Sequence, residues 1–392
     1  MTRFDYLIVG GGMTADAAAH GIRKHDTKGS IGVIGAEPDP PYNRPPLTKA
    51  LWKGDDLDSI WRKIDETGAE LMLGQRVTGV DPAKRQVTGD NGATHEYGKL
   101  LLATGGTPRR LANAPDAVIY YRTVADYRKA RKLADGKASF VVIGGGFIGS
   151  EIAAGIRMQE RDVTLVLKDE GIGARVFPSD LSRHLVDYYR EKGVTVRTGE
   201  SVGGVETKGN KLAVQLGNGN KLEADGVIAG LGIEPNVELA RAAGLKVTDG
   251  IEVDQQLRTS RPEIYAAGDV ANFHNPALGI RVRVEHEDNA NTMGEAAGRN
   301  MAGAGQPYDH LPFFYSDLFE LGYEAVGDLS SRHQTVADWK EKFREGVVYY
   351  LDGGRVRGVL LWNVWNQVDA ARALIAEPGP FRPEQLTGRI SA

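Results

Sequence analysis

Two glycine-rich segments have the residue types and spacing of loops that bind the phosphates of a dinucleotide. The key positions are Gly10, Gly12 and Ala15 in the first segment and Gly144, Gly146 and Gly149 in the second. In such a loop the first glycine allows a tight turn, the second lets a pyrophosphate reach the backbone, and a small third residue lets a helix pack closely on a strand. The N-terminal N–H groups of the following helix add hydrogen-bond donors and a positive dipole end. We therefore predict two nucleotide-binding turns in one chain.

The elements around the two turns support this prediction. A buried strand precedes each turn, at 6–9 and 140–143, and an alanine-rich helix follows it. A second strand then ends near an acid, Glu37 in the first copy and Asp169 in the second. One glycine fingerprint alone would be weak, because glycines also make ordinary turns, but two complete strand–helix–strand units are much more specific.

Length and composition indicate a soluble globular protein with more than one domain. A chain of 392 residues exceeds what one hydrophobic core usually organises, so we expect two or three domains. Hydrophobic residues make up 41% and charged residues 26%, and the 50 glycines indicate many tight turns or close ligand contacts. No apolar run reaches the ~18 residues of a membrane helix, and the N-terminus enters a strand directly, so we expect a cytoplasmic protein without a membrane span.

The sequence also excludes several kinds of site. It contains no cysteine, which rules out disulfides, iron–sulfur ligation and a redox-active cysteine pair, so any electron store must be a bound cofactor. The eight histidines are dispersed without metal-ligand spacing, and we expect no metal site. With a net charge of -4 and basic residues spread among acids, we expect no nucleic-acid partner.

The remaining segments complete the predicted organisation. Stretches at 77–97 and 201–227 are β-rich, and glycine-bearing strand ends occur at Thr104-Gly105 and at Gly232. From about 309 onward, aromatic-rich strands form a hairpin around Gly353-Gly354, and an amphipathic helix at about 367–376 covers them. The fold class is α/β, with two Rossmann-like domains and an α+β C-terminal domain. The expected domains are a discontinuous first domain (1–112 and 245–308), an inserted second domain (113–244) and a third (309–392).

Several motifs outside the glycine turns are distinctive. They are PYNRPPLTK at 41–49 with Leu51-Trp52, the segment 144–151, Gly268-Asp269, VEH at 284–286, Ser316-Asp317-Leu318, GYEAVG at 322–327 and Leu361-Trp362-Asn363. In these motifs the chain resembles, over nearly its whole length, the FAD/NAD(P)H oxidoreductases with two dinucleotide-binding domains. Within them it is most similar to microbial apoptosis-inducing-factor-like flavoproteins and to ferredoxin-reductase-like enzymes.

The resemblance implies FAD on the first unit, NAD(H) on the second, and a C-terminal domain that covers the flavin. The candidate FAD-binding residues are Gly10, Gly12, Ala15, Glu37, Arg44, Pro45, Lys49, Thr104, Gly105, Asp269, Glu285, His286 and Tyr315. The candidate residues for the nicotinamide dinucleotide are Gly144, Gly146, Gly149, Asp169 and Gly232. The candidate catalytic residues are Lys49, Glu151 and Phe147.

Lys49 and Glu151 are the candidates with the most direct chemical role. Hydride transfer needs stacked flavin and nicotinamide rings with a fixed charge nearby, and a lysine that donates near flavin N5 favours the reduced ring. Taken alone, a surface lysine and a glutamate in the first turn of a helix would be the simpler interpretation. The Arg-Pro-Pro-Leu-Thr-Lys string favours the functional one. Phe147 alone would be a core residue at a helix start, but its place after Gly146 favours the dinucleotide cleft.

Other flavin-side candidates also have two interpretations. Pro45 begins either a rigid turn or a kink that lays apolar surface against the isoalloxazine ring. Glu285 and His286 precede a small-residue helix at about 288–302, whose N-terminus either stabilises charge on the reduced flavin or is an ordinary helix start. Tyr315 stands where the family usually has tryptophan, which leaves the electron acceptor open.

The coenzyme preference depends on the residues after the second strand of the second unit. Asp169 would accept hydrogen bonds from a ribose 2′-hydroxyl and repel a 2′-phosphate, which favours NADH. Lys168 and Arg175 favour NADPH instead, and Glu170 is a substitute acceptor. We expect NADH, with NADPH as the alternative.

The resemblance implies an FAD-dependent NAD(P)H oxidoreductase that transfers hydride from NADH to FAD. The electrons then pass to oxygen, a quinone or a small redox protein. Two alternatives stay open at this point. One is a redox-sensing flavoprotein with a long-lived reduced flavin–NAD+ complex, and the other is a ferredoxin or rubredoxin reductase. We expect a monomer or a homodimer.

Overall fold

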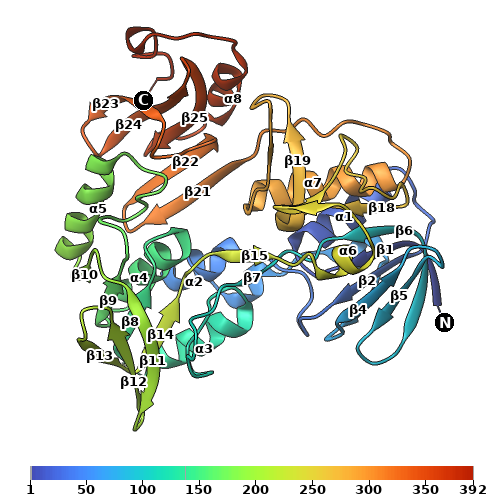
Figure 1. Ribbon diagram of the computed structural model, residues 1–392, viewed down its shortest axis with the longest axis horizontal. Coiled ribbons are helices and arrows are strands. Elements are labelled where there is room, and N and C mark those ends of the chain that lie inside the picture. Colours follow the sequence, from blue (N-terminus) through green and yellow to red (C-terminus); the bar gives the residue numbers. More distant parts are fainter. Residues whose placement is uncertain (1, 137, 392) are drawn as a thin grey trace. The chain divides into compact units, whose positions relative to one another are not determined.

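The structure is a computed structural model, and it describes residues 2–136 and 138–391. Its contacts divide the chain into two compact units, whose elements are labelled in Figure 1. Unit 1 comprises Met1–Asn43, Asp58–Thr107 and Glu234–Pro312, and unit 2 comprises Arg44–Leu57, Pro108–Ile233 and Phe313–Ala392. The finer division into three domains stays a prediction.

A seven-stranded sheet forms the centre of unit 1. Its path runs β3 (Glu70–Leu73), β2 (Ile31–Gly35), β1 (Thr2–Val9), β6 (Thr94–Leu102), β5 (Gln86–Gly89) and β4 (Val77–Asp81), and β18 (Ile264–Ala266) also pairs with β6. Strands β3, β2, β1, β6 and β18 are parallel, whereas β5 pairs antiparallel with both β6 and β4. The carboxyl end of β1 therefore lies between those of β2 and β6, with Val9 opposite Ile34 and Leu102. Nucleotides bind at such an edge in α/β sheets.

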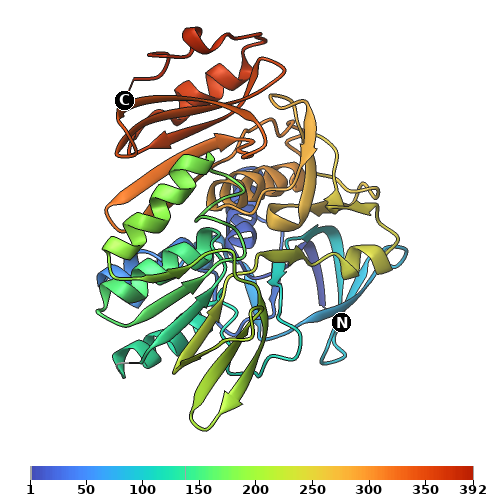
Figure 2. The same cartoon turned by 60° about the vertical axis from the view of Figure 1, so that its left-hand side comes forward.

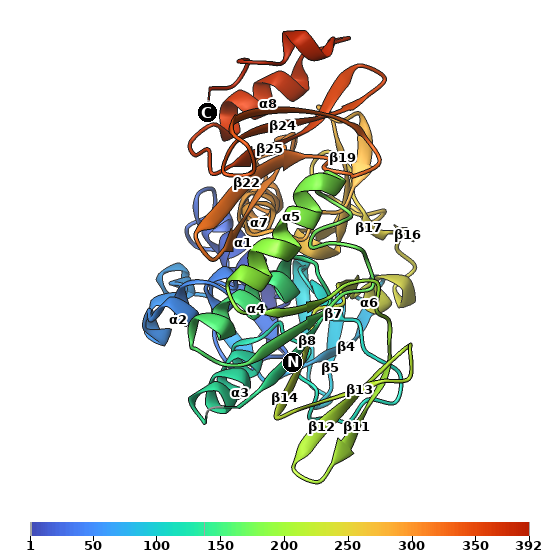
Figure 3. The ribbon, with the colours of Figure 1, turned by 90° about the vertical axis from the view of Figure 1, so that its left-hand side faces the viewer.

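Two helices of unit 1 pack closely on each other. Helix α1 (Met13–Arg23) lies beside α7 (Glu287–Met301), as Figure 3 shows. Small residues permit this contact, since a Cβ added to Gly298 would lie only 2.0 Å from the carbonyl oxygen of Ala18. Apolar side chains of both helices join the buried cluster of the parallel strands. The helix predicted at about 288–302 is confirmed, shifted by one residue.

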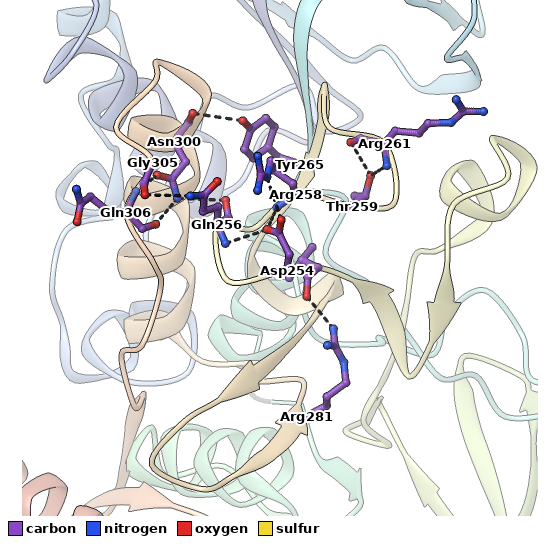
Figure 4. Close-up of polar contacts among 11 residues, drawn as sticks. Asp254, Gln256, Arg258, Thr259, Arg261, Tyr265, Arg281, Asn300, Gly305 and Gln306 are labelled. Carbon is purple, nitrogen blue, oxygen red and sulfur yellow. Dashed lines mark hydrogen bonds and ion pairs between the residues drawn. The ribbon is translucent and has the colours of Figure 1, made fainter.

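A polar network holds the segment that leads into β18 (Figure 4). The side-chain amide of Asn300, near the end of α7, donates to the carbonyls of Gln256 at 3.1 Å and Gln306 at 2.8 Å. The hydroxyl of Tyr265, within β18, donates to the carbonyl of Asn300 at 3.3 Å. Because β18 runs directly into the turn that carries Asp269, these bonds fix the backbone before that candidate site residue.

The remaining elements of unit 1 are short. A four-stranded sheet has the order β16 (Val247–Thr248), β17 (Gly250–Glu252), β19 (Ala271–Asn275) and β20 (Ile280–Val282), and α6 is a short helix (Glu238–Ala242). Two of the points at which the chain passes between the units lie in β7 (Gly106–Pro108) and β15 (Ile233–Pro235).

Unit 2 contains a second nucleotide-binding arrangement. Its parallel sheet has the order β10 (Thr195–Arg197), β9 (Val163–Val166), β8 (Phe140–Ile143) and β14 (Gly226–Ala229). Its helices are α3 (Val124–Asp135), α4 (Phe147–Met158) and α5 (Ser179–Glu191). Strands β11 (Val202–Lys208), β12 (Lys211–Leu216) and β13 (Lys221–Ala224) form an antiparallel sheet, whose hairpin is yellow-green in Figure 2. The two predicted strand–turn–helix–strand units are confirmed as β1–α1–β2 and β8–α4–β9.

A five-stranded antiparallel sheet follows in the last part of unit 2. Its order is β21 (Phe313–Leu318), β22 (Leu321–Gly327), β25 (Arg355–Trp362), β24 (Glu345–Asp352) and β23 (Gln334–Glu341). Gly353 and Gly354 make the turn between β24 and β25, both with positive φ, as predicted. Helix α8 (Val368–Ala376) packs on β22 and β25, which confirms the predicted C-terminal helix (Figure 3).

The segment Arg44–Leu57 makes its contacts within unit 2. It contains a short 3-10 turn (Pro45–Leu47) and helix α2 (Ala50–Lys53). The indole N–H of Trp52, which is 1% exposed, donates to the carbonyl of Leu47 at 2.9 Å. The side-chain amide of Gln159, the C-cap residue of α4, donates to the carbonyl of Trp52 at 2.6 Å. These bonds attach α2 to the nucleotide-binding part of unit 2.

Residues 2–136 and 138–391 lack both a membrane-spanning helix and a cluster of metal-ligating side chains. None of the helices in that part of the chain is long and apolar enough to cross a membrane. Those residues also contain no group of three or more histidine, aspartate or glutamate side chains that could hold a metal ion.

Candidate active site

The first glycine turn has the backbone geometry of a phosphate-binding loop. Gly10 directly follows β1 with a φ of 123°, and a Cβ there would lie 2.1 Å from the carbonyl oxygen of Ala103. Gly12 is the N-cap of α1 and adds no side chain at the helix N-terminus. Ala15 is fully buried, so its methyl group has a place in the packing between α1 and the sheet.

The second turn repeats this geometry with one stricter requirement. Gly144 has a φ of 108°, and a Cβ there would lie 2.3 Å from the carbonyl oxygen of Gly230. A Cβ at Gly146, the N-cap of α4, would meet no heavy atom within 4 Å, so the backbone is open to a ligand. At Gly149 a Cβ would lie only 1.8 Å from the carbonyl oxygen of Gly144. The third small position therefore accepts alanine in the first turn and requires glycine in the second.

The two predicted ribose acceptors differ in their surroundings. Glu37, two residues after β2, is half-buried and accepts a hydrogen bond from the Tyr42 hydroxyl at 2.5 Å. Asp169, three residues after β9, is exposed, as are Lys168 and Glu170. The structure therefore shows a side-chain partner for the Glu37 carboxylate, whereas the Asp169 side chain is exposed to solvent.

The remaining candidates of unit 1 are held by hydrogen bonds. Thr104 exchanges two bonds with Asn236, both at 2.8 Å, and Gly105 accepts the Asn236 backbone N–H. Asp269 lies in a 3-10 turn, and its carbonyl accepts a hydrogen bond from Arg283 at 3.1 Å.

Arg283 also links the next pair of candidates to this turn. Its guanidinium contacts the carboxylate of Glu285 at 2.5 Å, and Glu285 is exposed. His286 is the N-cap of α7, without a capping side-chain bond. Arg283 was not predicted from the sequence, because an arginine two residues before a glutamate has no distinctive pattern.

Lys49 and Glu151, which are far apart in the sequence, form a buried ion pair in unit 2. Lys49 Nζ lies 2.6 Å from Glu151 Oε1, and the side chains are 11% and 3% exposed. Glu151 projects from the second turn of α4, since the first turn of that helix has no acidic residue. The alternative interpretation of a surface lysine and a first-turn glutamate is therefore wrong for both residues.

Two hydroxyl groups complete the surroundings of Glu151. Thr48 Oγ1 donates to Glu151 Oε2 at 2.5 Å, and Ser316 Oγ, from β21, donates to Glu151 Oε1 at 2.5 Å. Thr48 and Ser316 are both buried. Neither residue was predicted as a site residue, although each lies inside a distinctive motif, because the sequence pattern does not show which hydroxyl faces the carboxylate.

Aromatic rings surround the ion pair. Lys49 Nζ lies 5.2 Å from the ring centroid of Tyr315, close enough for a cation–π interaction. Phe147, the first residue of α4, is half-buried and meets Phe314 edge-on at 5.1 Å between ring centroids. Phe147 is thus no core residue, and the structure brings it into the same unit as Lys49, Glu151 and Tyr315.

Burial near the Glu151 carboxylate raises the pKa of two tyrosines. Desolvation raises the pKa of Tyr189 and of Tyr323 well above the ordinary value, and the charge of Glu151 raises both further. Both hydroxyls therefore stay protonated and neutral. Lys49 is the cation that pairs with Glu151 in this apolar and aromatic environment.

The other predicted positions in unit 2 are placed as follows. Arg44 donates to the carbonyl of Arg122 at 2.8 Å, and Pro45 begins the 3-10 turn that precedes Thr48. Gly232 is exposed, with a φ of 81° and open space where a Cβ would be.

A family model described as pyridine nucleotide-disulphide oxidoreductase matches residues 4–294. This chain belongs to that family. A second model, described as the C-terminal part of mitochondrion-associated apoptosis-inducing factor, matches residues 297–342 and 337–377. As a member of the oxidoreductase family, the chain is an FAD-dependent NAD(P)H oxidoreductase. The family name suggests a redox-active cysteine pair, but this sequence contains no cysteine.

Individual relatives match over nearly the full chain. The mitochondrial apoptosis-inducing factor 1 of Dictyostelium discoideum is 34% identical over 95% of this chain and 78% of its own length. The ferredoxin–NAD(+) reductase component of the anthranilate 1,2-dioxygenase system of Burkholderia cepacia is 34% identical over 98% of this chain and 97% of its own. A solved structure of a covalent putidaredoxin reductase–putidaredoxin complex has a TM-score of 0.90 at 33% identity, covering 98% of this chain and 96% of the other.

The geometry of this family member fits two dinucleotides. Gly10 and Gly144 each end a central parallel strand where a side chain would collide with the backbone, and each turn opens onto a helix N-terminus. Such loops offer backbone N–H groups to a pyrophosphate. The fold and both cofactor classes expected from the sequence are thus confirmed.

Proposed function

We propose that this chain is an NADH-dependent reductase of a small electron-transfer protein. This proposal depends on the similarity of the chain to reductases that are named for such carriers. The similarity covers nearly the whole length of both proteins in each comparison. The carrier is a separate protein of the ferredoxin type. A chain without cysteine cannot hold an iron–sulfur cluster on thiolates, so the one-electron centre has to be supplied by the partner.

The residues of the chain have the following roles in this proposal. The turns at Gly10 and Gly144 bind the two pyrophosphates, Glu37 binds the ribose on the FAD side, and Asp169 favours NADH over NADPH. When bound, FAD accepts hydride from the nicotinamide and gives electrons to the acceptor. Lys49 supplies a fixed positive charge and Glu151 holds that charge in place, because the two atoms are paired at 2.6 Å in a buried site.

A comparison of acceptors tests this function. NADH consumption by the FAD-loaded protein is measured with a [2Fe–2S] ferredoxin, with a quinone and with oxygen alone. We expect turnover with the ferredoxin to exceed that with the other two by at least about tenfold in kcat/KM. Equal or faster turnover with quinone or oxygen across a panel of ferredoxins would reject the proposal.

The second candidate function is a redox-state reporter that turns over slowly. It is favoured by the match of the C-terminal sheet to the apoptosis-inducing factor model and by the Dictyostelium relative. Mixing the protein with NADH in air separates the two functions. A persistent long-wavelength absorption band with little NADH consumption supports the reporter, and rapid turnover with a ferredoxin supports the reductase.

A cytoplasmic location and a monomeric or homodimeric state belong to the same proposal. Gel filtration of the oxidised and NADH-reduced protein tests the second point. A change of oligomeric state on reduction would favour the reporter.

A further inference from the structure

Glu151 receives three hydrogen bonds on its two carboxylate oxygens. Oε1 accepts from Lys49 Nζ at 2.6 Å and from Ser316 Oγ at 2.5 Å. Oε2 accepts from Thr48 Oγ1 at 2.5 Å. The carboxylate therefore cannot rotate about its terminal bond without breaking at least one of these bonds.

The donors and the carboxylate come from three segments of unit 2 that are distant in sequence. Thr48 and Lys49 lie between the 3-10 turn and α2, Ser316 lies on β21, and Glu151 lies on α4. The exposed fractions of Thr48, Glu151 and Ser316 are 6%, 3% and 1%. A carboxylate this deeply buried needs hydrogen-bond donors from the protein on its oxygens, because water cannot replace a missing donor.

The backbone in front of Thr48 is fixed independently. The carbonyl of Leu47 accepts hydrogen bonds from the Tyr121 hydroxyl at 2.5 Å and from the Trp52 indole at 2.9 Å. Burial raises the pKa of Tyr121 well above its ordinary value, so this hydroxyl stays a donor. Thr48 thus approaches Glu151 from a rigid support rather than from a mobile loop.

We propose that Thr48 and Ser316 are positioning residues for hydride transfer, which lock the Glu151 carboxylate so that it holds the Lys49 ammonium at one point. This inference rests on the proposed role of Lys49 in the reductase. The hydroxyls carry no charge and therefore do not neutralise Glu151. The two hydroxyls donate to carboxylate lone pairs that Lys49 does not use. The carboxylate therefore keeps one orientation, and the lysine keeps one position.

The two residues contribute unequally. Without Ser316 Oγ, Oε1 of Glu151 keeps its bond to Lys49. Without Thr48 Oγ1, Oε2 of Glu151 loses the one donor that it has among the described residues. A buried carboxylate oxygen without a donor carries its full desolvation cost. The loss should therefore be larger for Thr48 than for Ser316.

The test uses four variants of the FAD-loaded protein. Thr48→Val removes the hydroxyl at nearly constant volume, Thr48→Ser keeps it, and Ser316→Ala is the second removal. Ser182→Ala is the matched control, because Ser182 is equally buried in unit 2 and its hydroxyl bonds to the carbonyl of Ile172 at 2.8 Å, with none of the four residues above. Stopped flow gives the limiting rate of flavin reduction and the Kd for NADH, and a crystal structure of Thr48→Val gives the position of Lys49.

We expect Thr48→Val to lower the limiting rate about 10- to 100-fold with an unchanged Kd, and Ser316→Ala to lower it less. Thr48→Ser should restore the rate, Ser182→Ala should leave it unchanged, and the crystal structure should show Lys49 Nζ displaced from Glu151. Unchanged rates in both removal variants, or an undisturbed Lys49–Glu151 pair in the Thr48→Val crystal, would overturn the inference. If Thr48→Val does not fold, Ser316→Ala decides. Lys49→Ala, measured in parallel, distinguishes a failure of this inference from a failure of the proposed function. If Lys49→Ala reduces flavin slowly while the hydroxyl variants have normal rates, only the positioning role of the hydroxyls is rejected. If Lys49→Ala also has a normal rate, the proposed role of Lys49 is rejected.

Discussion

At the scale of single residues, a few buried polar contacts define the site at which we propose that hydride transfer occurs. The Lys49–Glu151 pair is expensive to bury, and one partner without the other would leave an uncompensated charge in an apolar site. Such pairs persist where a fixed charge has a use, and here it lies beside Tyr315 in the nucleotide-binding unit that contains Gly144.

Removal of the lysine is the most direct test at this scale. Lys49→Ala should slow flavin reduction by NADH about 100-fold while FAD stays bound, because a preorganised charge near the reacting atoms is lost. Lys53→Ala is the control, since Lys53 is nearby but 43% exposed and pairs with Asp317 instead. Stopped-flow reduction measures both, and an unchanged rate for Lys49→Ala would remove this residue from the mechanism.

We propose that one side chain, Asp169, also decides the coenzyme preference. Asp169→Ala should lower the ratio of NADH to NADPH efficiency about tenfold, since the acceptor for the 2′-hydroxyl and the repulsion of a 2′-phosphate are both lost. Steady-state kinetics with each coenzyme give the ratio. Our assignment is wrong if the unmodified protein already prefers NADPH.

At the scale of elements, the two glycine turns set the backbone geometry of the predicted nucleotide-binding loops. The two glycine turns have the same path, but the third small residue is alanine in one and glycine in the other. The reason is local: Ala15 has room for its methyl group, and Gly149 faces the carbonyl of Gly144. The same motif therefore tolerates different substitutions in its two copies.

This difference predicts a selective effect. Gly149→Ala should weaken NAD+ binding by at least about tenfold, because a Cβ 1.8 Å from a carbonyl oxygen forces the turn open. FAD binding should persist, since the first turn lies in the other unit. Calorimetric titration with NAD+ and the flavin content of the purified protein measure the two effects, and Ala15→Gly, which introduces no clash, serves as the comparison.

The turn between β21 and β22 offers a pH test. Hydrogen bonds from Lys192 and then Tyr188 lower the pKa of Glu320 to about 2 from its ordinary value of 4.5. The folded-state pKa is the lower one, so the stabilisation is complete above about pH 4.5 and is lost as the pH falls toward 2. Glu320 is mostly exposed, so the effect should stay within ~1 kcal/mol. The free energies of unfolding of the wild type and of Glu320→Gln, measured with denaturant, should differ most near neutral pH and become equal in acid. A difference that does not change with pH would contradict this prediction.

At the scale of the whole molecule, the chain combines two nucleotide-binding folds with a five-stranded antiparallel C-terminal sheet and has no cysteine. The segment Arg44–Leu57 interrupts unit 1 in the sequence but makes its contacts in unit 2. Lys49 and Glu151 are therefore held together within one compact unit. Their pairing depends on the local packing of that unit.

The lack of cysteine predicts the electron count of the protein. Anaerobic titration should reduce the bound flavin fully with about one equivalent of NADH, because the chain provides no disulfide as a second two-electron store. Thiol-alkylating reagents should leave activity unchanged. A requirement for about two equivalents would show a second redox centre and contradict the sequence argument.

The two nucleotide-binding units and the C-terminal hairpin could be predicted from consecutive residues, because a glycine turn between a strand and a helix is a local feature. The class of cofactor was implied by the resemblance of the motifs to a known family, and the absence of cysteine needs no structure. The tertiary structure decided that Thr48 and Ser316 face Glu151, that Glu151 is buried in the second turn of its helix, and that residues 44–57 pack in unit 2. Those facts depend on packing between segments more than a hundred residues apart, and no periodicity along the chain encodes which buried hydroxyl meets which carboxylate.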